Sequence, residues 1–159
     1  MLTKVHHVTY VVESVQQMAA YLKDNFDMTP ERTEDQPKLG YKSLLYRIGE
    51  TLVDFFEPLR DARGEALVQR PPATGFVRML KESGPGISHI GWGVNGIEQA
   101  FETLKKKGNK FHGSPPTDGG TFGYKTFSID PSCSQGVFFH LAEGDSVAIV
   151  EGKGVHDPR

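Results

Sequence analysis

The sequence contains a single cysteine, no long hydrophobic run and no excess of charge of one sign. Cys133 alone excludes a disulfide framework and a zinc cluster held by thiolates. No apolar run approaches the roughly 18 residues that a membrane-spanning helix needs. The 18 Lys and Arg residues nearly balance the 20 Asp and Glu residues, so charge gives no reason to expect nucleic acid or a membrane surface as a partner. The N-terminal residues also lack the layout of a signal peptide, and we expect a soluble cytoplasmic protein.

An internal repeat organises the chain. The run from His89 to Val94 repeats the run from His7 to Val12, and both precede apolar residues at helical spacing. Further strand-like runs follow each predicted helix: Arg32 to Asp35, Tyr41 to Ile48 and Thr51 to Pro58 in the first half, and Lys110 to His112, Tyr124 to Asp130 and Gly136 to Glu143 in the second. Each half therefore predicts the element order β-α-β-β-β.

This pattern predicts an α+β fold in which two βαβββ modules form a curled mixed-sheet cup. The modules occupy residues 1–60 and 87–143. Residues 61–86 form a linker with a short helix near Thr74 to Glu82, which glycine and proline end at residues 84–86. Residues 144–159 form a C-terminal tail whose last stretch we expect to be frayed.

Four side chains that could bind a metal lie at equivalent places in the two halves. His7 and His89 lie in the first predicted strands, and Asp54 and His140 lie in the last. A polar group within an apolar strand is costly without a partner, and imidazole and carboxylate groups are ligands for divalent transition metals. If the sheets of the two halves join, the four groups could surround one ion. The alternative is structural: hydrogen-bonded histidines, and an Asp54 that caps a turn or pairs with Arg47.

Four segments resemble a known family. They are Lys4 to Val8, Val53 to Leu59, Phe76 to Ile90 and Gly136 to Leu141. Together they resemble the vicinal oxygen chelate superfamily, which includes glyoxalases, bleomycin-resistance proteins and dioxygenases, and within it the methylmalonyl-CoA epimerases. The resemblance spans about residues 4–143. It implies the glyoxalase-like fold that the repeat also predicts.

The resemblance also implies a ligand set and catalytic residues. One divalent ion (Zn, Ni, Co, Mn or Fe) would be held by His7, Asp54, His89 and His140. Asp54 stands where the family usually has Glu or Gln, and His140 stands where it usually has a Glu that also transfers protons. Lys38 aligns near the epimerases' other proton-transferring Glu. His140 and Lys38 are therefore the candidate catalytic residues, and the aromatic residues near the last strands are candidates for apolar walls.

The implied function is that of a metal-dependent isomerase, epimerase or lyase. Such an enzyme would stabilise an enolate-like intermediate of a small oxygen-rich or acyl substrate, with acyl-CoA as one candidate. The expected partners are a small-molecule substrate and, from the resemblance, a second copy in a homodimer, but no nucleic acid and no membrane. An iron-dependent dioxygenase and a non-catalytic protein that binds a small ligand are the alternatives.

Four other features are assigned no function. Gly91 to Gly96 matches the dinucleotide fingerprint G-x-G-x-x-G, but no acidic residue follows at the spacing that the ribose contact requires. Cys133 has no base motif around it. His6 is expected to point away from His7, because neighbours in a strand alternate. The loop from Pro115 to Gly123 is interpreted as a hairpin connection.

Overall fold

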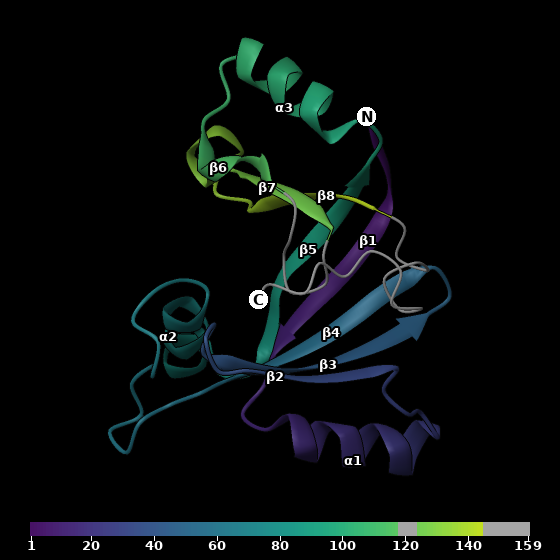
Figure 1. The fold of residues 1–159 in the computed structure, drawn as a ribbon, viewed down its shortest axis with the longest axis vertical. Helices are drawn as coiled ribbons and strands as arrows, with labels where there is room; N and C mark the ends of the chain where they lie inside the picture. Colours follow the sequence, from purple (N-terminus) through teal and green to yellow (C-terminus); the bar gives the residue numbers. More distant parts are fainter. Residues whose placement is uncertain (118–123, 145–159) are drawn as a thin grey trace. The chain divides into compact units, whose positions relative to one another are not determined.

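The computed structural model describes residues 1–117 and 124–144 and divides them into two compact units (Figure 1). The first unit is Val8–Ser88. The second unit combines Met1–His7 with the chain from His89 onward. The strands β1 (Leu2–Val11) and β5 (Gly86–Val94) each have residues in both units.

The first unit contains the helix α1 (Val15–Phe26), three antiparallel strands and the helix α2. The strands are β2 (Arg32–Gln36), β3 (Tyr41–Ile48) and β4 (Thr51–Pro58), and α2 spans Ala73–Ser83. Ile48 pairs with Thr51, so the predicted two-residue hairpin connects β3 to β4. The helix α1 begins after Ser14, whose side chain accepts a hydrogen bond from the Gln17 N–H. Apolar residues of α1 then pack against β3 and β4 around Leu44, Tyr46 and Phe55.

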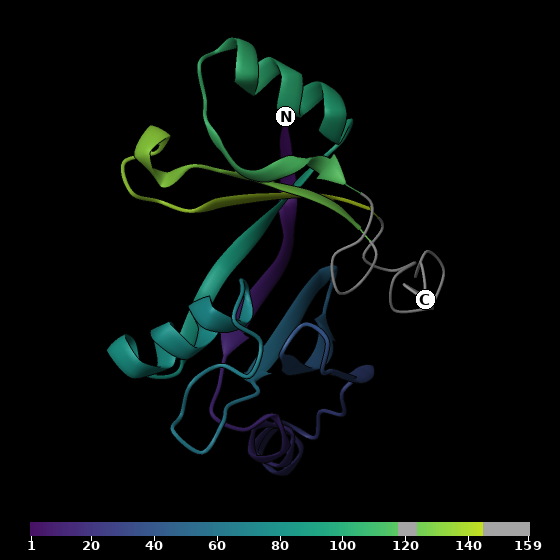
Figure 2. The same ribbon diagram turned by 60° about the vertical axis from the view of Figure 1, so that its left-hand side comes forward.

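The second unit holds the start of β1, the strand β5, the helix α3 and three further strands. These elements are α3 (Ile97–Lys106), β6 (Phe111–Thr117), β7 (Lys125–Ile129) and β8 (Phe139–Glu143), with a short 3₁₀ turn at Pro131–Cys133. The strand β8 is parallel to β5 and antiparallel to β7, and β7 is antiparallel to β6, so the sheet is mixed. Figure 2 shows α3 lying over β6 and β7.

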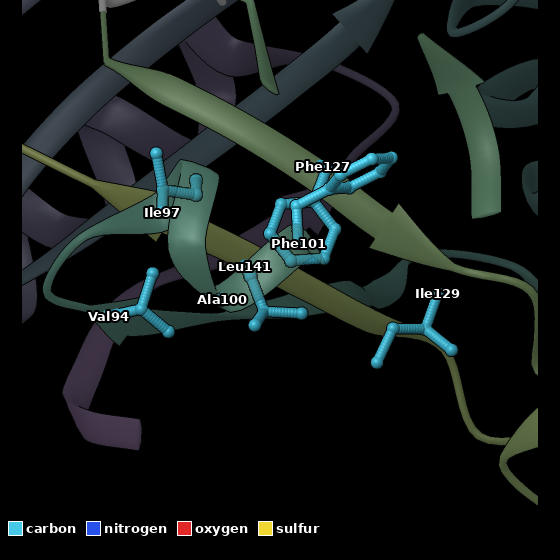
Figure 3. Close-up of a cluster of buried hydrophobic side chains, with 7 residues drawn as sticks. All are labelled: Val94, Ile97, Ala100, Phe101, Phe127, Ile129 and Leu141. Atoms are coloured by element: carbon cyan, nitrogen blue, oxygen red, sulfur yellow. The ribbon is translucent and has the colours of Figure 1, made fainter. Parts of the chain in front are cut away.

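The core of the second unit lies between α3 and its sheet (Figure 3). The apolar positions of α3 recur at helical spacing and contact apolar residues of β7 and β8. The buried members of this cluster are Val94, Ile97, Ala100, Phe101, Phe127, Ile129 and Leu141. Burying about seven such side chains anchors the helix to the sheet through the hydrophobic effect.

The predicted α+β fold with its repeated β-α-β-β-β order is confirmed, with one strand shortened. The strand predicted from Gly136 begins only at Phe139. Gln135 and Gly136 have positive φ angles of 56° and 85°, which are incompatible with extended backbone, so the chain turns there. The predicted loop lies partly outside the described residues, at 118–123, and so does the tail beyond Gly144. Within the described part of the chain, no helix is long and apolar enough to cross a membrane.

Candidate metal centre

Three histidines come together in the second unit. His7 lies on β1, His89 on β5 and His140 on β8, and one ring nitrogen of each lies within 4.8 Å of the others. The Nε2 atoms of His7 and His89 are 3.4 Å apart. The ring centroids of His89 and His140 are 4.8 Å apart. His7 is buried and the other two are half-buried, so the group is partly open to solvent. This group of three is the histidine triad.

A glycine makes room for the triad. Gly91 on β5 pairs in register with His140 on β8. A Cβ atom built on Gly91 would lie 2.1 Å from Cε1 of His7, closer than any side chain could approach. The His7 ring therefore lies directly against the backbone of β5. Within the glycine-rich run that matches a dinucleotide motif, Gly91 has this packing role. The sequence signal for this role is a glycine inside a strand that also carries a ligand candidate.

His6 contacts His7, contrary to the expectation that it would point away. Their Nδ1 atoms are 2.9 Å apart, and both rings are buried with 1% of their surface exposed. The buried ring of Tyr124 packs against both, with centroids 4.7 Å from His6 and 5.3 Å from His7. Alternation of side chains along the strand does not prevent two adjacent imidazoles from meeting edge to edge. The structure thus adds His6 to the surroundings of the triad.

His140 has an outer partner of its own. Ser128 lies opposite His140 in the β7–β8 register, and its Oγ is 2.9 Å from Nδ1 of His140. Phe138 is 39% exposed and stacks on His140 with ring centroids 6.2 Å apart. The rings of His89 and Phe138 also meet in a T-shaped arrangement, with centroids 6.0 Å apart. An exposed apolar surface therefore lies beside the triad, as expected for a wall of a small-molecule site.

Burial keeps the triad uncharged. Desolvation lowers the pKa of His89 to about 4. It also lowers the pKa of His140 to about 3, with further lowering by the charges of His89 and His6. The pKa of His7 falls well below its ordinary value, first because of burial and then because of His140, His89 and His6. At pH 7 all three rings are neutral, and a neutral imidazole is the form that binds a metal. The donor set fits a divalent transition ion.

Asp54 and Lys38 belong to the first unit. Asp54 is buried on β4 with 2% exposed, and burial raises the pKa of its carboxyl group to about 7 against a hydrogen bond with Thr9. Arg47, the partner of Asp54 in the structural alternative, forms an ion pair with Glu31 at 3.3 Å. Lys38 is exposed in the connection between β2 and β3. The metal-binding role of Asp54 and the catalytic role of Lys38 stay predictions.

Known proteins resemble this chain over most of its length. An ethylmalonyl-CoA/methylmalonyl-CoA epimerase of Cereibacter sphaeroides is 23% identical over 143 residues, which cover 90% of this chain and 99% of the relative. A variant of Streptomyces coelicolor methylmalonyl-CoA epimerase, solved in complex with 2-nitronate-propionyl-CoA, superposes with a TM-score of 0.73 and 16% identity, covering 92% of this chain and all of the other. A hypothetical protein of Bacillus halodurans superposes with a TM-score of 0.71 and 24% identity, covering 89% and 94%. These structural likenesses establish the fold.

The family itself is shown by the sequence. Residues 6–127 match the family described as the Glyoxalase/Bleomycin resistance protein/Dioxygenase superfamily. The match covers more than half of the chain and includes His7 and His89 of the triad. The resemblance found in the sequence segments is thereby confirmed. The chain belongs to the Glyoxalase/Bleomycin resistance protein/Dioxygenase superfamily.

Proposed function

We propose that this protein is a metal-dependent enzyme that epimerises, isomerises or cleaves a small acyl or other oxygen-rich substrate. The observation that carries the proposal is the histidine triad, whose three donor nitrogens lie within 4.8 Å of one another. Neutral imidazoles that converge in this way are a typical site for a divalent transition ion. His7, His89 and His140 are the proposed ligands.

Acyl-CoA thioesters are the first substrates to test. The Cereibacter relative is an ethylmalonyl-CoA/methylmalonyl-CoA epimerase, and the Streptomyces structure holds 2-nitronate-propionyl-CoA. The Bacillus halodurans relative has no named substrate, so the fold does not narrow the choice by itself. The half-exposed Phe138 beside the triad would suit the apolar part of a short acyl group.

A bound ion would act as a Lewis acid that stabilises negative charge on substrate oxygens. The side chains of the triad are neutral, so they leave the positive charge of an ion undiminished, whereas a carboxylate ligand would partly cancel it. Phe138 would exclude water on the side where it stacks on His140.

Proton transfer needs a further group. The lowered pKa of His140, about 3, suits a ligand better than a base that takes up a proton near neutral pH. We therefore propose His140 first as a ligand. Its second role as proton carrier remains a proposal, as do proton transfer by Lys38 and metal binding by Asp54. Asp54→Asn and Lys38→Met test the two residues of the first unit, the former by metal affinity and the latter by kcat.

The test combines metal content with isotope exchange. The purified protein is analysed for bound metals, stripped with a chelator and reloaded with Zn²⁺, Ni²⁺, Co²⁺, Mn²⁺ or Fe²⁺ in turn. Methylmalonyl-CoA and related acyl-CoA thioesters are then incubated with it in D₂O, and NMR follows exchange of the proton next to the thioester carbonyl. We expect exchange only with metal bound, and its loss in His89→Ala.

Two outcomes would contradict the proposal. Consumption of dioxygen by the iron-loaded protein, without exchange on any acyl substrate, would indicate a dioxygenase. Unchanged affinity for a small ligand after metal removal, without turnover, would indicate a non-catalytic binding protein.

A further inference from the structure

We propose that His6 and Ser128 are positioning residues that determine which ring nitrogen His7 and His140 present to a metal ion. The inference rests on the metal site proposed above and assigns the groups behind it. Outer partners of this kind fix the tautomer and the orientation of a ligating histidine. In metal sites they are commonly carboxylates or backbone carbonyls, whereas the partners here are a second imidazole and a hydroxyl group.

The contact between His6 and His7 allows one arrangement of protons when a metal is bound. Their Nδ1 atoms are 2.9 Å apart, so one of the two must carry a proton and donate a hydrogen bond, which the other accepts. The Nε2 atom of His7 faces the triad, 3.4 Å from Nε2 of His89. If that nitrogen binds an ion, the proton of His7 lies on Nδ1 and is donated to His6. His6 must then carry its own proton on Nε2.

The surroundings of the two rings make this arrangement specific. His6 and His7 are each 1% exposed, so water has little access to take the place of either partner. Tyr124 packs on one side of both rings, and the backbone of Gly91 lies against His7. The position of the His7 ring is therefore determined by packing, and its tautomer is determined by His6.

Ser128 has the same relation to His140. Its hydroxyl lies 2.9 Å from Nδ1 of His140, and a hydroxyl oxygen can accept a hydrogen bond from an N–H at that position. The β7–β8 register places the two residues directly opposite each other. Nε2 is then the nitrogen of His140 that remains available to an ion. His7 and His140 thus each have an outer partner on Nδ1.

Zinc affinity in matched variants tests the proposal. His6→Phe and Ser128→Ala remove the acceptors with little change in size, and we expect each to weaken Zn²⁺ binding by about 10- to 100-fold. His6→Asn keeps an acceptor oxygen near the position of Nδ1, and Ser128→Thr keeps the hydroxyl, so both are expected to bind within a few-fold of wild type. His112→Phe, at an exposed position on β6, is the control for adding a phenyl ring. Calorimetric titration measures all five variants.

A second measurement reports the tautomers themselves. In zinc-loaded protein labelled with ¹⁵N-histidine, we expect protons on Nδ1 of His7 and His140 and on Nε2 of His6. A proton on Nδ1 of His6, or full affinity in both His6→Phe and Ser128→Ala, would overturn the inference while leaving the metal site in place. Failure of the wild-type protein to bind any divalent metal would overturn the metal site and the inference together. If His6→Phe does not fold by circular dichroism, Ser128→Ala and the wild-type spectrum decide.

Discussion

At the scale of single residues, the candidate site depends on side chains that the fold brings together from three strands. His7, His89 and His140 were recognisable in the sequence because they occupy repeated positions in strand-like runs. The contribution of Gly91 had only a general signal, a glycine within a strand that carries a ligand candidate, because its effect depends on the His7 ring lying against it. The three proposed ligands and the glycine give two separate predictions.

Loss of a ligand is expected to abolish metal uptake. His7→Ala and His89→Ala each remove one of three converging donors, and two imidazoles hold a divalent ion far more weakly than three. We expect the metal content of both variants to fall to background in elemental analysis of protein purified in parallel. His112→Ala, on the exposed side of β6, is expected to keep wild-type content. Equal metal content in all three variants would show that the triad is not the site.

Adding one methyl group to β5 is expected to displace a ligand. In Gly91→Ala the new Cβ would lie 2.1 Å from Cε1 of His7, so the ring must move away from the triad. We expect Zn²⁺ affinity to fall at least about 10-fold and the melting temperature to fall through overpacking. Gly86→Ala is the matched control on the same strand, since its nearest neighbour is Met79 Cε at 3.6 Å. Similar affinities in the two variants would contradict the role assigned to Gly91.

At the scale of elements, both units use the same device at the start of a helix. Glu57 on β4 accepts a hydrogen bond from the N–H of Val15, the first residue of α1, at 2.9 Å. Glu143 on β8 likewise accepts from the N–H groups of Gly96 and Ile97 at the start of α3. A carboxylate from the last strand thus satisfies free N–H groups and complements the positive end of the helix. The internal repeat extends to this contact.

Removing either carboxylate is expected to destabilise the fold. Glu57→Ala and Glu143→Ala each leave helix N–H groups without their acceptor, and we expect each to lower the free energy of unfolding by about 0.5–2 kcal/mol. Urea denaturation followed by circular dichroism measures the difference. Glu102→Ala, at an exposed position on α3, is the control and is expected to change stability by less than about 0.5 kcal/mol. If Glu102→Ala lowers the free energy of unfolding as much as the two variants do, the stabilising role assigned to Glu57 and Glu143 at the helix starts is contradicted.

At the scale of the whole molecule, buried ionisable groups make the stability of the metal-free protein depend on pH. The folded-state pKa of His140, about 3, lies below its ordinary value of 6.5, because burial disfavours its charged form. Its contribution to stability is therefore fully present above pH 6.5 and is lost as the pH falls towards 3. Asp54 has the opposite sign. Its pKa is raised by burial from 3.8 to about 7, so its contribution is present below pH 3.8 and is lost as the pH rises towards 7.

A single variant separates the histidine contribution from that of Asp54. His140 stays neutral in the folded protein, whereas it becomes protonated in the unfolded chain as the pH falls from 7 to 5. This difference is expected to lower the free energy of unfolding of the metal-free protein by about 2 kcal/mol. His140→Gln lacks this titration, so its stability should fall less over the same interval, by about that amount. Urea denaturation at the two pH values in the presence of a chelator measures both proteins. Parallel pH dependences in wild type and variant would show that His140 is not held neutral by the fold.

The sequence by itself determined the order of the elements, the repeat of β-α-β-β-β and the positions of the candidate ligands. Each of these follows from local patterns: apolar periodicity, turn residues, and polar side chains within apolar runs. The strand boundaries of β3 and β4 were predictable for the same reason, whereas the start of β8 was not, because a positive φ at Gln135 has little sequence signal.

Only the tertiary structure decided which side chains meet. The 2.9 Å contact between His6 and His7, the serine behind His140 and the glycine against His7 depend on ring orientation and on register between strands. Gly91 and His7 lie on strands far apart in the chain, and Ser128 and His140 lie on successive strands. No local pattern encodes such contacts, because they form only when segments brought together by burial of their apolar faces settle into one register.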